Sequence, residues 1–221
     1  MFKNIMKSKI GKSMGGVIAA AAVVVMMPMT ASAHCDSVEG PTVADGIKAM
    51  QSNNVNYVLK WVQPKYEKEI TEKFNLSMKV KDLSPEAKQV SEKYFFSELV
   101  RVHRAGEGEA FDGLKPVGTP IDKKVAAADK SIGIGNLSPL EGLVEPDKMP
   151  ELKKRFDKVM ALKNFDVNNV EAGREYIEAY VMFFKFAEGE EDGHHAAHTV
   201  DAHNAHNTHN AHTQTGHTEA H

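Results

Sequence analysis

The chain has 221 residues, of which 42% are hydrophobic and 26% are charged, and its formal net charge is −3. This composition supports a packed core and excludes wholesale disorder, and the near-balanced charge excludes a generally basic protein that coats nucleic acid. The single cysteine excludes an internal disulfide and a metal site made of cysteines alone. Among the eleven histidines, only His34 and His103 lie before Gly193.

Residues 1–33 have the features of a secretory signal peptide. Four lysines precede an apolar stretch over residues 14–29, and Ala31-Ser32-Ala33 forms an A-x-A cleavage site. The apolar stretch is shorter than the roughly 20 residues that a membrane-spanning helix needs. We therefore expect cleavage, no stable membrane insertion afterwards, and a mature chain that begins at His34 in the periplasm or outside the cell.

The body, residues 34–189, is divided by glycines and prolines into segments with apolar residues at spacings of three and four. Ser84-Pro85 has the pattern of a helix start. We expect helices over residues 41–51, 54–62, 66–78, 85–105, 121–132, 150–163 and 170–188. No segment shows the alternation typical of a strand, so the sequence predicts one all-α domain, a bundle of about five to seven helices.

The mature N-terminus is a candidate metal chelate. Cleavage after Ala33 would give His34 a free amine beside its imidazole, and Cys35 would add a thiolate one residue later. Asp36 could ligate weakly or accept a hydrogen bond. Nitrogen and sulfur donors together favour nickel, copper or zinc over magnesium or calcium. The alternative interpretation is a lone thiol with no ligand role.

His103 is the one histidine inside the body. It shares a helical stripe with Phe96 and Val100, and Glu107 follows four residues later. One interpretation is that His103 completes the N-terminal metal site, with Glu98 or Glu107 as a ligand, a proton carrier or a partner that orients the ring. The other is a core histidine hydrogen-bonded to a carboxylate.

The C-terminal tail, residues 190–221, has no lysine, arginine or aromatic residue, and we expect it to be disordered. Imidazole is the commonest protein ligand for zinc, copper and nickel, so the tail predicts metal capture or buffering. Incidental binding by a low-complexity segment and pH sensing are the alternatives. Its nine histidines are His194, His195, His198, His203, His206, His209, His212, His217 and His221.

The start of the mature chain resembles the hook of nickel superoxide dismutase, which opens His-Cys-Asp and supplies a second cysteine four residues after the first. Here Glu39 stands at that second position, and Gly40 matches the glycine that follows. The resemblance covers only these few residues. It implies metal binding, whereas the missing thiolate puts the redox chemistry in doubt.

A longer resemblance spans most of residues 34–188. The segments that carry it are His34-Cys35-Asp36, Gly40-Pro41, Trp61-Val62, residues 94–108, Gly113-Leu114-Lys115-Pro116 and Ala172-Gly173-Arg174-Glu175. Together these segments resemble an uncharacterised exported bacterial family, domain-of-unknown-function family 6448. The resemblance implies a helical domain that follows a signal peptide, and it implies no established activity.

The sequence therefore predicts an exported protein that binds nickel, copper or zinc. An ordered site would contain His34, Cys35, Asp36, His103 and Glu107, and the tail would gather or buffer ions. A metal-dependent redox enzyme of the superoxide dismutase type and a non-catalytic envelope module that contacts other proteins are the alternatives. Metal ions are the only partners that the residues indicate.

Overall fold

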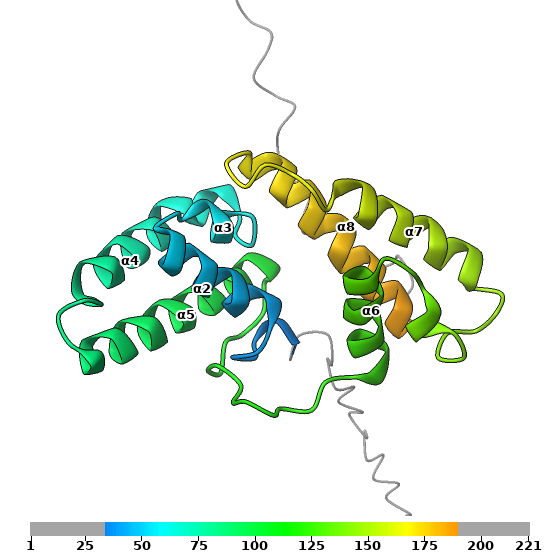
Figure 1. Cartoon of the computed structure of the whole chain (residues 1–221), viewed down its shortest axis with the longest axis horizontal. Helices are drawn as coiled ribbons and strands as arrows, with labels where there is room; N and C mark the ends of the chain where they lie inside the picture. The colour runs from blue at the N-terminus through cyan, green and yellow to red at the C-terminus, as the bar shows by residue number, and fades with distance from the viewer. Residues whose placement is uncertain (1–33, 190–221) are drawn as a thin grey trace, which may run out of the picture.

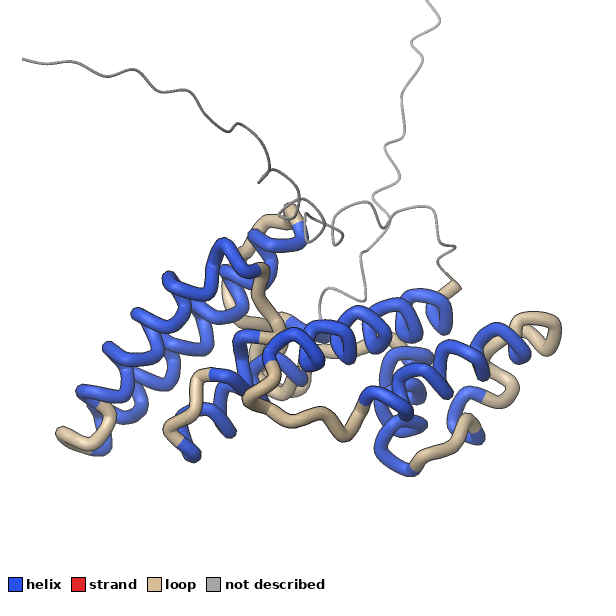
Figure 2. Tube along the Cα trace, turned by 90° about the horizontal axis from the view of Figure 1, so that it is seen from above, coloured by secondary structure: helices blue, strands red, loops and turns tan. Residues whose placement is uncertain are grey.

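The computed structural model describes residues 34–189, and these residues form seven α-helices and two short 3-10 helices (Figure 1). No strand occurs among them, which confirms the all-α prediction (Figure 2). No helix between residues 34 and 189 is both long and apolar enough to cross a membrane. The predicted signal peptide and histidine-rich tail lie outside the described residues.

The first half of the structure contains four of the helices: α2 (Pro41–Ser52), α3 (Asn56–Leu59), α4 (Glu67–Val80) and α5 (Pro85–Glu107). The 3-10 helix η1 (Pro64–Tyr66) precedes α4. These helices bury an apolar cluster that includes Phe95, Leu99 and Ile70. Helix α5 begins as predicted, because the Ser84 hydroxyl accepts a hydrogen bond from the Ala87 N–H at 3.1 Å.

The second half contains α6 (Lys123–Ile134), η2 (Ser138–Leu140), α7 (Met149–Leu162) and α8 (Val170–Glu188). It has its own apolar cluster, in which Phe183, Leu140 and Leu152 are fully buried. Figure 1 shows the two groups of helices side by side, joined by the loop of residues 109–122. Trp61 comes from the first half of the chain but packs in the cluster of the second half.

The segment predicted as a helix over residues 54–62 forms only the single-turn helix α3. Asn54 starts a local turn, since its side chain accepts the Asn56 N–H at 3.0 Å, and the chain turns again before Pro64. Carbonyls at the end of this segment also accept hydrogen bonds from a side chain elsewhere in the chain. The guanidinium of Arg174 on α8 donates to the carbonyls of Leu59 and Val62, both at 3.3 Å.

A second connection between the halves surrounds Lys60. Its ammonium lies 2.8 Å from the carboxylate of Asp45, and both side chains are buried. The ammonium also lies over the rings of Phe165 and Tyr176, 5.1 and 5.9 Å from their centroids. Cation–π contacts are strengthened when the cation is removed from water. Lys60 therefore attaches the turn after α3 both to Asp45 and to the rings of Phe165 and Tyr176.

The first described residues, from His34 onwards, are held by the loop of residues 109–122. The Lys115 N–H donates to the Asp36 carbonyl at 2.9 Å, and the Val38 N–H donates to the Lys115 carbonyl at 3.0 Å. The chain then folds back so tightly that a Cβ atom on Gly40 would lie 2.1 Å from the His34 carbonyl oxygen. Only glycine fits at this close approach.

Candidate metal site at the junction of the two halves

The two histidines of the body are both buried, with 8% of His34 and 5% of His103 exposed. A row of aromatic rings connects them. The ring of His34 lies 6.0 Å from that of Phe184, which lies 4.4 Å from Tyr180. Trp61 follows at 6.0 Å from Tyr180 and 5.7 Å from His103. The packing therefore places both imidazoles in one apolar layer.

The tautomer of His103 follows from its main-chain partner. Its Nδ1 lies 2.8 Å from the Trp61 carbonyl oxygen, which can only accept, so Nδ1 carries the proton. In the neutral ring Nε2 then has a free lone pair. Histidines that bind metals are commonly oriented by this kind of carbonyl contact. The carboxylate of Glu107 lies 3.6 Å from Nε2, slightly beyond hydrogen-bond distance.

Helix α5 reaches Glu107 because Gly108, at φ 76°, ends the helix in place of Gly106. The sequence prediction ended the helix at residue 105. Gly106 stays helical and packs against Gln63, whose side-chain amide donates to the Gly106 carbonyl. The two additional residues place Glu107 on the same face as His103.

His34 faces a carboxylate that the sequence prediction missed. Its Nε2 lies 2.6 Å from Asp129 on α6, in a geometry that does not form a hydrogen bond. The Tyr180 hydroxyl donates to the same carboxylate at 2.9 Å. Burial, together with the Asp129 charge, raises the pKa of Tyr180 well above its usual value, so the phenol keeps its proton. No local pattern around Asp129 indicates this role.

Asp36 is almost fully buried beside a cation that sequence reasoning also missed. Only 4% of Asp36 is exposed, and the Arg104 guanidinium lies 3.5 Å from its carboxylate. Burial raises the pKa of Asp36, whereas Arg104 and His103 act in the opposite direction. Arg104 also faces Glu107 at 3.6 Å and Glu109 at 3.7 Å, so it balances three acids.

The Cys35 thiol lies among these acids. Although part of the residue is exposed, burial is the main reason that the pKa of its thiol is raised far above the usual range. The carboxylates of Glu107 and Asp36 raise it further, and the Thr42 hydroxyl lowers it. A thiol in this environment is neutral and a poor nucleophile. A nearby cation would lower the pKa of the Cys35 thiol, because it stabilises the thiolate.

Several buried polar atoms of this cluster make no hydrogen bond. They include His34 Nε2, Asp36 Oδ1 and His103 Nε2. Buried polar groups are nearly always paired, so these three atoms keep unused hydrogen-bonding capacity. Within residues 34–189, no three or more His, Cys, Asp and Glu side chains are nevertheless placed so that they could hold a metal ion. The predicted ligands are therefore gathered at one junction but not arranged as a cage.

Glu39 does not take part in this cluster. Its carboxylate accepts a hydrogen bond from the Gly118 N–H at 2.9 Å, and it fixes the loop of residues 109–122 to the N-terminal segment. Glu39 stands where the superoxide dismutase hook has its second cysteine, and in this chain it attaches the loop.

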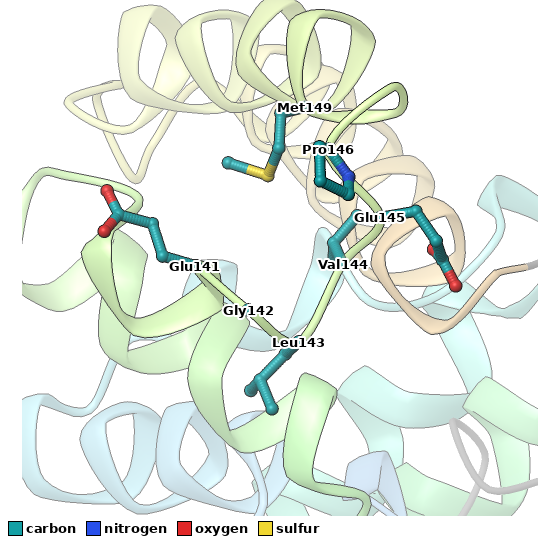
Figure 3. A pocket seen from close by; sticks show the side chains of 7 residues that line it. All are labelled: Glu141, Gly142, Leu143, Val144, Glu145, Pro146 and Met149. Carbon is teal, nitrogen blue, oxygen red and sulfur yellow. The ribbon is translucent and has the colours of Figure 1, made fainter.

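A surface hollow of about 310 Å³ lies elsewhere, in the loop between η2 and α7. Figure 3 shows the carboxylates of Glu141 and Glu145 on opposite sides of this loop, with the Met149 thioether between the chain segments. The hollow brings no set of complementary groups together, and the junction remains the better candidate for chemistry.

A family model described as "Family of unknown function (DUF6448)" matches residues 39–186. The match includes Trp61, His103, Glu107 and Arg174, and it begins after the His34-Cys35-Asp36 segment. No curated protein and no solved structure matches the chain.

Proposed function

The chain belongs to DUF6448, a family of unknown function, and from the chemistry of its junction we propose that it is an exported protein that binds a transition-metal ion there. One observation carries the proposal. His103 donates Nδ1–H to a carbonyl, and its buried Nε2 is left without a hydrogen bond, 3.6 Å from Glu107, whose charge also acts on the Cys35 thiol.

The donors fit nickel, copper or zinc. After cleavage, His34 would contribute its amine and imidazole, Cys35 its thiolate and His103 its Nε2 atom, with Asp36 and Glu107 available as oxygen donors. Mixed nitrogen and sulfur ligands select these metals. Because the thiol is protonated in the metal-free protein, binding would release a proton and would weaken as pH falls.

Binding would also require these side chains to move towards one another. In the structure His34 lies beside Asp129, and His103 lies beside Glu107. Since His34 contacts the second half and His103 belongs to the first, a shared ion would connect the halves. Metal binding should therefore stabilise the protein against unfolding.

The histidine-rich tail would capture or buffer ions around this site. Glu39 gives no support to the redox alternative, because its carboxylate bonds with Gly118 where that chemistry would need a second thiolate. We therefore propose binding and not superoxide removal.

The test is metal analysis of the untagged mature protein, with its nine tail histidines replaced by glutamine so that only the junction can bind. Mass spectrometry must first show that the N-terminal residue is His34. After equilibration with Ni²⁺, Cu²⁺ or Zn²⁺ and desalting, we expect one ion per chain for at least one metal. Failure to retain any stoichiometric ion would refute the site.

Matched variants locate the ligands. Cys35→Ser and His103→Gln should each lower the affinity at least about tenfold, in the range found when metal-site groups are lost. Glu107→Gln should lower it as well, whereas Glu109→Gln should not, although both acids face Arg104 at similar distances. Equal affinities in the wild type, Cys35→Ser and His103→Gln would exclude these residues as ligands.

A further inference from the structure

We propose that the first described segment of the chain, residues 34–40, is a latch that opens and closes while the helices stay folded, and that its opening admits small molecules to the Cys35 thiol. The latch does not depend on the proposed metal site, since it concerns the metal-free protein. Its attachment to the loop, its small apolar contact and an unbonded polar atom within it support this proposal.

Three hydrogen bonds attach the latch to the loop that joins the two halves. The Lys115 N–H donates to the Asp36 carbonyl at 2.9 Å, and the Val38 N–H donates to the Lys115 carbonyl at 3.0 Å. The Gly118 N–H donates to the Glu39 carboxylate at 2.9 Å. The loop contains no helix of its own (Figure 1). The latch is therefore held by few bonds, and they lead to an irregular segment.

The latch buries little apolar surface. Val38 is its one aliphatic residue, and 37% of Val38 is exposed. Cys35 adds a partly buried contact with the apolar cluster of the second half. In helix α2, which follows the latch, Val43 and Ala49 are in contrast fully buried. Segments with few buried apolar contacts open at a lower cost than the core, so the latch should open without unfolding α2.

A buried polar atom of the latch is poorly satisfied in the closed position. Asp36 is only 4% exposed, yet its Oδ1 atom makes no hydrogen bond. The Arg104 guanidinium lies 3.5 Å from its other carboxylate oxygen. Water would bond with the carboxylate once the latch opens, because an exposed carboxylate is fully hydrated. This hydration offsets part of the contacts that opening removes.

Gly40 is the position at which the latch can turn, because α2 begins one residue later. The two halves of the structure remain connected without the latch. The Arg174 guanidinium donates to the Val62 carbonyl at 3.3 Å, and the Lys60 ammonium lies 5.1 Å from the centroid of the Phe165 ring. Opening can therefore be a local event that leaves the helices and their mutual packing in place.

The Cys35 thiol is the group that the latch controls. Burial is the main reason that the pKa of this thiol is raised far above its usual range, and a protonated thiol is a poor nucleophile. Because Cys35 belongs to the latch, its thiol reaches solvent when the latch opens. The rate at which a small reagent modifies Cys35 should then follow the fraction of molecules with an open latch.

Amide hydrogen exchange of the metal-free mature protein, measured by NMR, tests the opening. The Val38 and Lys115 amides bond between latch and loop, whereas Leu99 is fully buried in α5. After correction for intrinsic rates, we expect the first two amides to exchange at least about a hundredfold faster than that of Leu99, with little dependence on urea. One common rate and one common urea dependence for all three would overturn the latch, because the segment would then open only by global unfolding.

A pair of variants locates the latch. Glu39→Ala removes the acceptor of the Gly118 N–H, whereas Asp112→Ala removes an exposed acid that pairs with a lysine of the same loop. Glu39→Ala should speed both the exchange of the Val38 amide and the alkylation of Cys35 by iodoacetamide, each by about three- to tenfold, as the loss of one hydrogen bond predicts. Asp112→Ala should stay within about twofold of wild type in both measurements.

Two results of this comparison would refute the proposal. Equal acceleration in both variants would show that the order of the loop, and not the latch, controls exchange. Faster exchange of Val38 without faster alkylation of Cys35 would show that the latch does not govern access to the thiol. Both measurements are made without metal, so the metal analysis described above succeeds or fails separately.

Discussion

Replacing Gly40 by alanine should damage the junction without damaging helix formation. Gly40 precedes α2 with φ −75° and ψ 164°, which alanine adopts freely, so the backbone conformation itself creates no strain. The added Cβ would, however, lie 2.1 Å from the His34 carbonyl oxygen. An ordinary contact needs about 3.5 Å, so the carbonyl must move by more than about 1 Å.

This displacement acts on the residue that carries the predicted amine and imidazole ligands. Binding sites tolerate errors of about 0.5 Å, so metal affinity in Gly40→Ala should fall at least tenfold. The overlap should also cost about 1–3 kcal/mol of unfolding free energy, as insertions into packed sites do. Gly133→Ala on α6 is the matched control, because a Cβ atom at this position would have no neighbouring atom within 4 Å. It should gain about 0.5–1 kcal/mol and bind metal normally.

Urea unfolding and Ni²⁺ competition measure the two effects, with the tail histidines replaced in both proteins. Wild-type affinity in Gly40→Ala would refute the link between the tight turn and the metal site. An equal loss of affinity in Gly133→Ala would show that the effect is unspecific.

Three further predictions concern the groups around the junction. Iodoacetamide at pH 8 should alkylate Cys35 at least about tenfold more slowly in the folded, metal-free protein than in urea, because burial raises the pKa of its thiol; equal rates would contradict this. Burial raises the pKa of Tyr176 to about 12 and that of Tyr180 well above the usual value, so their contribution to stability is complete below pH 10. It should be lost as pH rises from about 10 towards 12, and an equally steep alkaline loss in the variant with both tyrosines changed to phenylalanine would disprove this origin. Arg174→Met should cost about 1–3 kcal/mol in urea unfolding because it removes the guanidinium that bonds with the Val62 carbonyl and pairs with the Glu67 carboxylate. Lys153→Met, which removes an exposed ion pair on α7, should cost less than about 0.5 kcal/mol, and similar losses in both variants would count against the proposed connection.

The sequence by itself determined the helical class and most helix positions, because the relevant signals act over a few residues. The Ser84 hydroxyl reaches an N–H three residues away, and the apolar stripe of α8 repeats within one turn. Residue chemistry was equally local: His34, Cys35 and His103 stood out as ligand types wherever the fold would place them.

Tertiary structure decided which of these groups meet, and it added partners that no local pattern marks. Asp129 faces His34 across about a hundred residues of chain, and Arg104 balances the buried Asp36. Helix α5 also continues past Gly106, whose carbonyl accepts a hydrogen bond from the distant Gln63 side chain, and it ends at Gly108. Such contacts form only when whole helices pack together. Helix caps and apolar periodicity depend on residues a few positions apart, so they do not reveal which distant side chains will meet.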